Sequence, residues 1–108
     1  MICTQKLYTI YMNHFTEAVR HIVRNISLGQ TLSYGKVASL AGNPRAARVV
    51  GTIMRNNYDE TVPCHRVVAT NGIVGQYNRG GPQEKIRLLK SEGVKFTKTG
   101  KIDMSVYE

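Results

Sequence analysis

The sequence predicts one mostly α-helical domain with a small β-hairpin, built on a helix-turn-helix and resembling a winged helix. Three observations lead to this prediction. Apolar residues recur at helical spacing in several separate segments. A tight glycine-containing connection joins two of these segments, as it does in a helix-turn-helix. The chain has 108 residues, which suits a single hydrophobic core of modest size.

The first predicted helix begins after a cap at Asn13 and stops before Gly29. Its apolar residues lie at the spacing of one helix face: Phe15, Val19, Ile22, Val23 and Ile26. We therefore expect an N-terminal extension over residues 1–12, the domain itself over residues 13–93, and a polar, basic C-terminal tail over residues 94–108.

The second and third helices form the predicted helix-turn-helix. Ser33 can cap a short second helix that extends through Ala41. Gly42, Asn43 and Pro44 then supply a stop, a new cap and a proline in the first turn of the third helix. Two helices joined in this way are typical of a DNA-binding motif.

The third helix has an apolar face and a cationic face when it is drawn at about 100° per residue. The apolar face consists of Ala46, Val49, Val50 and Ile53, and the opposite face of Arg45, Arg48, Thr52 and Arg55. Ala47 and Gly51 lie between the faces, four residues apart, and would let the helix approach a groove wall closely. Tight packing inside the protein is the alternative explanation of Gly51.

A β-hairpin is predicted where residues 67–70 and 73–74 flank Asn71 and Gly72, because this pair suits a two-residue primed turn. The glycines within residues 75–81 indicate a loop that closes over a ligand. An ordinary flexible surface loop is the alternative.

The last predicted helix opens with Gly81 and Pro82 and ends at Gly93. No apolar run approaches the ~18 residues that a membrane span needs. The N-terminus also lacks the apolar segment and cleavage site of a secretory signal. We therefore expect an intracellular protein, cytoplasmic or, in a eukaryote, nuclear, with no membrane partner.

The charge distribution favours a polyanionic partner. The chain has fifteen Lys and Arg residues and seven Asp and Glu residues, which gives a formal net charge of +8. No acidic residue occurs between Ala18 and Tyr58, although several arginines do. A basic surface that only aids solubility is the alternative.

Cys64 is the candidate nucleophile, because a thiol beside the imidazole of His65 has a base within reach. The alternative is a small buried core residue. Cys3 lies near the terminus, so we expect no disulfide. The spacing of Cys3, His14 and His21 fits no tetrahedral zinc pattern, and we predict neither a metal nor a cofactor.

Several separated motifs occur in order along the chain: SY at 33–34, AGNPRAARVVG at 41–51, MRNN at 54–57, PCHRVV at 63–68, GQY at 75–77, and LL at 88–89 ahead of EG at 92–93. With them, residues 15–93 resemble the catalytic, DNA-binding domain of the O6-alkylguanine-DNA alkyltransferases, also called methylated-DNA-protein-cysteine methyltransferases. The resemblance implies a double-stranded DNA partner that contains O6-alkylguanine, and we expect the protein to act as a monomer.

The resemblance implies a catalytic group of four residues. Cys64 would accept the alkyl group irreversibly, so that each molecule acts once. His65 would draw off the thiol proton through a water molecule, and Glu92 would orient the imidazole. Tyr34 would crowd the target phosphate and help to protonate the departing guanine.

The resemblance also implies a DNA-binding group and a substrate pocket. Arg48 would fill the gap that the flipped base leaves, and the helix-turn-helix would lie in the minor groove. The implied DNA-binding residues are Tyr34, Arg45, Ala47, Arg48, Gly51 and Arg55. The implied pocket residues are Met54, Asn57, Val68, Gly75, Tyr77 and Asn78. Asn57 would brace the turn before the nucleophile, and the backbone near Val68 would read the guanine edge.

The main alternative is an alkyltransferase-like protein that binds the same lesion without chemistry and recruits another repair pathway. Such proteins carry tryptophan or alanine at the nucleophile position, whereas this chain has Cys64 together with His65 and Glu92. A helix-turn-helix regulator would leave these three residues unused. A thiol hydrolase would leave the basic helix unused. Asn78 and residues 58–62 depart from some relatives and leave the accepted alkyl size open.

Overall fold

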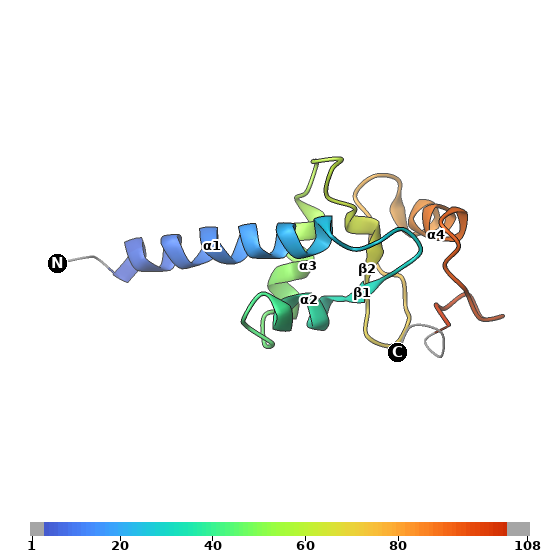
Figure 1. Cartoon of the computed structure of the whole chain (residues 1–108), viewed down its shortest axis with the longest axis horizontal. Coiled ribbons are helices and arrows are strands. Elements are labelled where there is room, and N and C mark those ends of the chain that lie inside the picture. Colours follow the sequence, from blue (N-terminus) through green and yellow to red (C-terminus); the bar gives the residue numbers. More distant parts are fainter. Residues whose placement is uncertain (1–3, 104–108) are drawn as a thin grey trace.

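The computed structural model describes residues 4–103 and consists of helices around a very short sheet (Figure 1). The elements are α1 (Thr4–Arg24), β1 (Leu32–Ser33), α2 (Tyr34–Leu40), α3 (Ala47–Arg55), the 3-10 turn η1 (Cys64–Arg66), β2 (Val67–Val68) and α4 (Gly81–Ser91). This arrangement confirms the mostly helical class with a helix-turn-helix. Within residues 4–103, no helix is both long and apolar enough to cross a membrane.

Helix α1 is longer than predicted, and its N-terminal turns extend beyond the rest of the molecule (Figure 1). The cap predicted at Asn13 is therefore wrong, because Asn13 lies inside the helix. The ring of Tyr11 stacks on Phe15 at 6.2 Å between centroids. Its hydroxyl accepts a hydrogen bond of 3.0 Å from Asn43, which ties this part of α1 to the turn between α2 and α3.

The helix-turn-helix is present, with a later start of its second helix than predicted. Ser33 caps α2 as expected, because its hydroxyl accepts a hydrogen bond of 3.0 Å from the backbone of Lys36. Asn43, in contrast, caps a separate turn, in which its side chain accepts from the backbone of Arg45 at 3.2 Å. Helix α3 therefore begins at Ala47 instead of Pro44.

The predicted hairpin is wrong in its pairing. The sheet joins β1 and β2 in parallel, with Leu32 beside Val67. The turn itself exists, but as a three-residue loop: Gly72 N–H donates to Ala69 at 3.1 Å, and Ala69 N–H donates to Ile73 at 2.9 Å. Gly72 has a φ of +85°, as the glycine of such a bulged loop does. The segment after the turn forms no strand, and the carbonyl of Gly72 accepts a hydrogen bond of 2.9 Å from the backbone of Ile102.

Two apolar clusters meet at β2. The first is built from α1, α2, α3 and the segment before η1. The second joins α4 to the C-terminal segment and consists of Val68, Val74, Leu89, Val94 and Ile102. Val67 belongs to the first cluster and Val68 to the second, since successive strand residues point to opposite sides. The described part of the expected tail is therefore packed against the domain.

Helix α4 ends as predicted at Gly93, in a Schellman motif. Gly93 N–H donates to the carbonyl of Lys90 at 3.0 Å, and Val94 N–H donates to that of Leu89 at 3.0 Å. The contact between Val94 and Leu89 in the second cluster accompanies this motif. Glu92 is the capping residue, so its backbone position is fixed by the helix end.

Candidate active site

Cys64 begins η1 and is only 6% exposed. Its N–H donates to the carbonyl of Val62 at 2.8 Å, which makes a tight bend just before the turn. The fully buried Asn57 holds this bend, because its side-chain amide donates to the same carbonyl at 3.1 Å. Cys64 is therefore held on a braced turn, and it lines two cavities, as Tyr77 also does.

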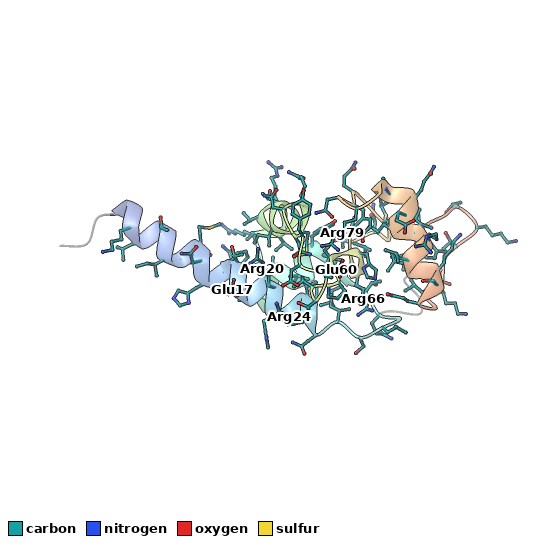
Figure 2. The ribbon with its side chains drawn as sticks, turned by 90° about the horizontal axis from the view of Figure 1, so that it is seen from above. Glu17, Arg20, Arg24, Glu60, Arg66 and Arg79 are labelled. Carbon is teal, nitrogen blue, oxygen red and sulfur yellow. The ribbon has the colours of Figure 1, made fainter. Side chains whose placement is uncertain are left out.

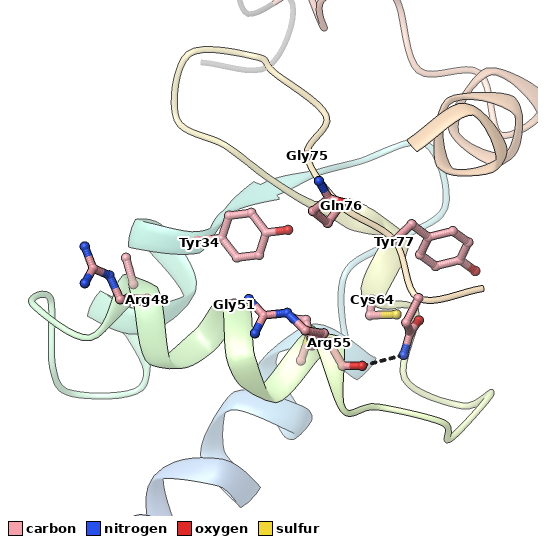
Figure 3. Close-up of a pocket in the computed structure, with 11 residues that line it drawn as sticks. Tyr34, Arg48, Gly51, Arg55, Cys64, Gly75, Gln76 and Tyr77 are labelled. Atoms are coloured by element: carbon pink, nitrogen blue, oxygen red, sulfur yellow. Dashed lines mark hydrogen bonds between the residues drawn. The ribbon is translucent and has the colours of Figure 1, made fainter. Parts of the chain in front are cut away.

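The first cavity, called the front cavity below, has a volume of about 400 Å³ (Figure 3). This volume lies within the usual range of about 300 to 1,000 Å³ for small-molecule sites. Its lining comes from α2, α3, η1 and the loop before α4: Tyr34, Ala47, Arg48, Gly51, Met54, Arg55, Cys64, Gly75, Gln76, Tyr77 and Asn78. Of the predicted pocket residues, Asn57 and Val68 are absent from this lining. Both are buried instead, Asn57 behind the bend and Val68 in the second apolar cluster.

The second cavity, called the back cavity below, has a volume of about 390 Å³, and its lining includes Arg24, Glu60, Arg66 and Arg79. Two of its lining residues, Arg79 and Glu60, approach each other at 4.0 Å (Figure 2). Arg24 approaches Asp59 at 3.7 Å. His65 lines this cavity and not the front one.

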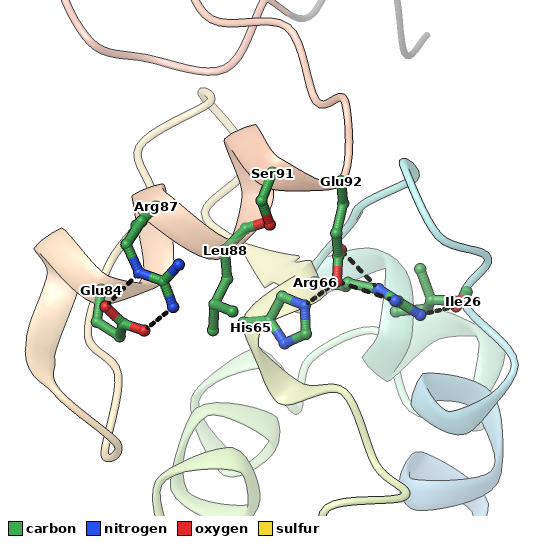
Figure 4. Close-up of polar contacts among 8 residues, drawn as sticks. All are labelled: Ile26, His65, Arg66, Glu84, Arg87, Leu88, Ser91 and Glu92. Carbon is green, nitrogen blue, oxygen red and sulfur yellow. Dashed lines mark hydrogen bonds and ion pairs between the residues drawn. The ribbon is translucent and has the colours of Figure 1, made fainter.

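His65 is held by Glu92, which lies 27 residues further along the chain (Figure 4). The distance between His65 Nε2 and Glu92 Oε2 is 2.8 Å. Arg66 forms a two-armed contact with the same carboxylate, at 3.0 and 3.1 Å, and donates to the carbonyl of Ile26 at 2.7 Å. The carboxylate is thus fixed from two sides.

The charge state of Glu92 determines the form of the imidazole. Burial acts to raise the pKa of Glu92, but hydrogen bonds from Arg66 and His65 outweigh it and hold that pKa below its ordinary value. An ionised carboxylate can only accept, so His65 Nε2 carries a hydrogen. In a neutral imidazole, Nδ1 is then free to act as a base.

Tyr34, which begins α2, lines the front cavity and is linked to a buried lysine. Lys85 Nζ lies 3.3 Å from the hydroxyl of Tyr34 and 3.1 Å from the carbonyl of Gln76. Burial and the nearby charge of Cys64 raise the pKa of Tyr34, against the lowering effect of Arg55. The phenol therefore keeps its proton at neutral pH.

Of the cationic residues predicted for the third helix, Arg48 and Arg55 lie on α3, and Arg45 lies in the turn before it. Arg48 and Arg55 lie at the rim of the front cavity, and Arg45 is exposed outside its lining. Ala47 and Gly51 are half-buried between them. A Cβ added at Gly51 would meet no described atom within 4 Å, so tight internal packing does not explain this glycine.

The loop before α4 closes one side of the front cavity. Asn78 anchors it by donating to the carbonyls of Arg55 at 2.8 Å and Asn57 at 2.7 Å. Gly75 has a φ of +81°, and a Cβ there would lie 3.6 Å from the Tyr34 hydroxyl. Met54, Gly75, Tyr77 and Asn78 line the cavity as the resemblance implies.

Sequence reasoning gave no role to three residues at the site: Arg66, Gln76 and Lys85. Lys85 had a detectable signal, because it lies four residues before the core residue Leu89 and so on the buried face of α4. Within residues 4–103, no group of three or more His, Cys, Asp or Glu residues is placed to hold a metal ion. Cys3 lies outside the described residues.

Comparisons with known proteins identify the family of the chain. The model of the family described as "6-O-methylguanine DNA methyltransferase, DNA binding domain" matches residues 14–94. The chain is 46% identical over 74 residues to a methylated-DNA--protein-cysteine methyltransferase of Cricetulus griseus, covering 68% of this chain and 35% of that protein. It is 40% identical over 96 residues to a DNA base-flipping protein of Escherichia coli, covering 86% of this chain and 72% of that protein.

Solved structures show the same fold. Atl1 of S. pombe, in complex with damaged DNA containing O6-carboxymethylguanine, has a TM-score of 0.77 at 31% identity, covering 88% of this chain and 94% of that one. The OGT of Mycobacterium tuberculosis in complex with DNA has a TM-score of 0.68 at 34% identity, covering 87% and 55%. The chain spans about a third of the length of the methyltransferases that it matches, 35% in the Cricetulus griseus protein and 38% in that of Homo sapiens.

Proposed function

Because the chain belongs to the family of the 6-O-methylguanine DNA methyltransferase DNA-binding domain, we propose that it repairs DNA by moving the alkyl group of O6-alkylguanine onto Cys64. One observation carries this proposal. The buried thiol of Cys64 lies in a cavity that opens beside the cationic face of α3, and the adjacent His65 is held by an ionised Glu92. A nucleophile, a base and a surface for a polyanion thus occur together.

The proposed reaction begins when His65 takes the thiol proton through a water molecule in the back cavity. The sulfur lone pair of Cys64 then forms a bond to the alkyl carbon, and the bond from that carbon to guanine O6 breaks. The electron pair stays with the guanine, which is protonated from the hydroxyl of Tyr34. The product thioether has no thiol left to ionise, so each molecule reacts once.

DNA binding in this proposal rests on α3. Arg45, Arg48 and Arg55 would neutralise phosphates, while Ala47 and Gly51 would let the helix backbone approach the groove. The target base would leave the duplex to reach the front cavity, with Arg48 in the gap. The partner is therefore double-stranded DNA containing O6-alkylguanine, in the compartment where DNA is found.

The test is to incubate the protein with a duplex containing O6-methylguanine and to weigh the intact protein. We expect the mass of one added methyl group, placed on Cys64 by fragmentation, and no addition with undamaged duplex. Cys64→Ala is the matched control and should gain nothing. A methyl group on another residue, or repeated turnover without modification, would contradict the proposal.

A second candidate function is lesion binding without chemistry. Its support is the likeness of the fold to Atl1, with a TM-score of 0.77 against 0.68 for the OGT of Mycobacterium tuberculosis. The same experiment separates the two functions. Tight binding to the O6-methylguanine duplex with no mass change, at a reduced thiol, would favour lesion binding.

A further inference from the structure

A short hairpin follows α4 and consists of residues 95–102, which we call the C-terminal hairpin. Phe96 and Ile102 face each other in an isolated antiparallel bridge. Next to this bridge, the backbone N–H of Thr97 donates to the carbonyl of Lys101 at 2.7 Å. The N–H of Lys101 in turn donates to the hydroxyl of Thr97 at 3.3 Å. The hairpin is therefore closed by its own hydrogen bonds.

The hairpin divides its side chains between the core and the solvent. Ile102 belongs to the second apolar cluster, and Phe96 packs against that cluster. Successive residues of an extended segment point to opposite sides, so the neighbours of these two residues point outward. Lys95 and Lys101 are accordingly exposed, and Lys98 in the turn between the arms is exposed as well. The outer side of the hairpin thus carries three lysines within seven residues.

The hairpin has little acidic charge to balance these lysines. Asp103 is the only acidic residue among residues 93–103, and its backbone N–H donates to the carbonyl of Lys95 at 2.9 Å. Asp103 is therefore near Lys95, at the end of the hairpin away from its turn. Within residues 4–103, neither Lys98 nor Lys101 forms an ion pair with a carboxylate. These two cations suit a polyanion, whereas a surface that only aids solubility is the alternative.

The hairpin continues a surface that begins at the front cavity. The backbone N–H of Ile102 donates to the carbonyl of Gly72 at 2.9 Å, which joins the hairpin to the turn after β2. That turn approaches the first residues of α2, because a Cβ added at Gly35 would lie 4.0 Å from the hydroxyl of Thr70. Gly35 follows Tyr34, which lines the front cavity. A continuous path therefore connects the mouth of the cavity with the hairpin.

We propose that the C-terminal hairpin is a second contact with the duplex, in which Lys98 and Lys101 bind phosphates that flank those bound by α3. This inference rests on the DNA partner of the proposed function. It assigns a role in binding to residues outside 14–94, the range that the family model matches. The surface described above joins the hairpin to the cavity, so the phosphates belong to the same duplex. Phosphate contacts fix orientation, and this one would fix the direction in which the protein lies along the duplex.

The first test measures the salt dependence of binding to undamaged duplex by fluorescence anisotropy. Each lysine that neutralises a phosphate contributes about 0.9 to the slope of log K against log salt. The double variant Lys98→Gln/Lys101→Gln should therefore have a slope that is shallower by nearly 2. Between about 50 and 200 mM salt, the advantage of wild type over this variant should shrink by about tenfold. An unchanged slope would overturn the proposal.

Two controls separate contact from net charge and from folding. Lys98→Arg/Lys101→Arg keeps both charges and should keep the wild-type slope. Lys6→Gln removes a charge from the first turns of α1, which extend away from α4 and the hairpin (Figure 1), and should also keep it. A loss per charge as large in Lys6→Gln as in the hairpin would overturn the proposal. Denaturant unfolding should give the same midpoint for all variants, because the replaced lysines are exposed.

The second test locates the hairpin on the DNA. It uses a Cys64→Ala background, which holds the protein at O6-methylguanine without transfer, and a duplex with about two helical turns on each side of the lesion. One flank or the other is then shortened by a little more than one turn, about 12 base pairs. Shortening one particular flank should abolish the affinity difference between lysine and glutamine hairpins, and shortening the other should not. A difference that survives both shortenings would place the lysines on a second DNA molecule and overturn the proposal.

The outcomes also separate this inference from the proposed chemistry. Transfer from free O6-benzylguanine to Cys64 involves no phosphate, so Lys98→Gln/Lys101→Gln should react with it at the wild-type rate. A slower reaction of this variant would overturn a role confined to duplex binding. Absence of transfer by the wild-type protein would overturn the proposed chemistry, while the salt slopes would still decide the role of the hairpin.

Discussion

The two cavities beside Cys64 are nearly equal in volume, about 400 and 390 Å³, but differ in chemistry. The front cavity is lined by aromatic rings, glycines and the cationic edge of α3, a lining suited to a flat base next to a phosphate backbone. The back cavity is lined by charged side chains and by His65. Under the proposed function, this difference divides the work, with recognition in the front cavity and proton removal in the back cavity.

The strongest test of this division is Cys64→Ala, which removes the atom that both cavities share. Transfer should be abolished, because no other described cysteine is present. Affinity for a duplex containing O6-methylguanine should stay within a few-fold of wild type, since the α3 face is unchanged. Fluorescence anisotropy measures the affinity and intact mass the transfer. Cys3→Ala should change neither, and transfer by Cys64→Ala would refute the assignment.

A change that acts through His65, which lines the back cavity, should affect rate without affinity. Glu92→Gln removes the charge that keeps a hydrogen on His65 Nε2, and we expect transfer roughly tenfold to a hundredfold slower. Single-turnover rates and duplex affinity are measured together. The control is Glu84→Gln, also on α4, whose carboxylate pairs with Arg87 at the surface. A parallel loss of affinity would show that the two sides are not separate.

A change confined to the front rim should affect duplex far more than free base. Arg48→Ala should slow repair of O6-methylguanine in duplex by about tenfold or more, because the extruded base is no longer held out. Reaction with free O6-benzylguanine should change little. Arg45→Ala, in the turn before α3 and outside the cavity lining, should lower affinity and leave the rate at saturating duplex unchanged. Equal losses on both substrates would remove Arg48 from this role.

The smallest expected effect separates stability from function within α3. Gly51→Ala should raise the free energy of unfolding by up to about 1 kcal/mol, because alanine favours a helix and the added Cβ meets no described atom within 4 Å. Duplex affinity should fall several-fold, since the methyl group would separate the helix from the groove. Denaturant unfolding and a binding titration measure both. Thr52→Ala is the exposed neighbour for comparison, and an unchanged affinity would mean that the groove does not approach here.

Local signals were enough to predict the ends of some elements. Pro82 marks the start of α4 through its fixed φ, and Gly93 marks its end through its left-handed φ. Each residue acts through its own backbone. The same reasoning failed at Asn43, where a cap and a following proline formed a separate turn instead of starting α3. A helix start and a separate turn use the same local residues here, so only the packing around them decides which one forms.

The pairing of β1 with β2 could not be predicted from the sequence. The partners β1 and β2 have two residues each, too short for any periodic pattern, and their parallel register depends on where α2 and η1 pack. The predicted site residues were found through motifs, which is why Cys64 and Tyr34 appeared and Lys85 did not. A lysine on a helix is normally exposed, and only its register with Leu89 indicates burial.

The double contact of Arg66 links the order of folding to the reactivity of the thiol. It joins the carbonyl of Ile26, 40 residues earlier, to the carboxylate of Glu92, 26 residues later. Closing loops of that length is among the slower parts of forming a small domain. A chain in which α4 has not yet docked has no carboxylate against His65. Under the proposed function, transfer to Cys64 then requires a docked α4, and a nascent or partly unfolded molecule would not use up its single reaction on the wrong electrophile.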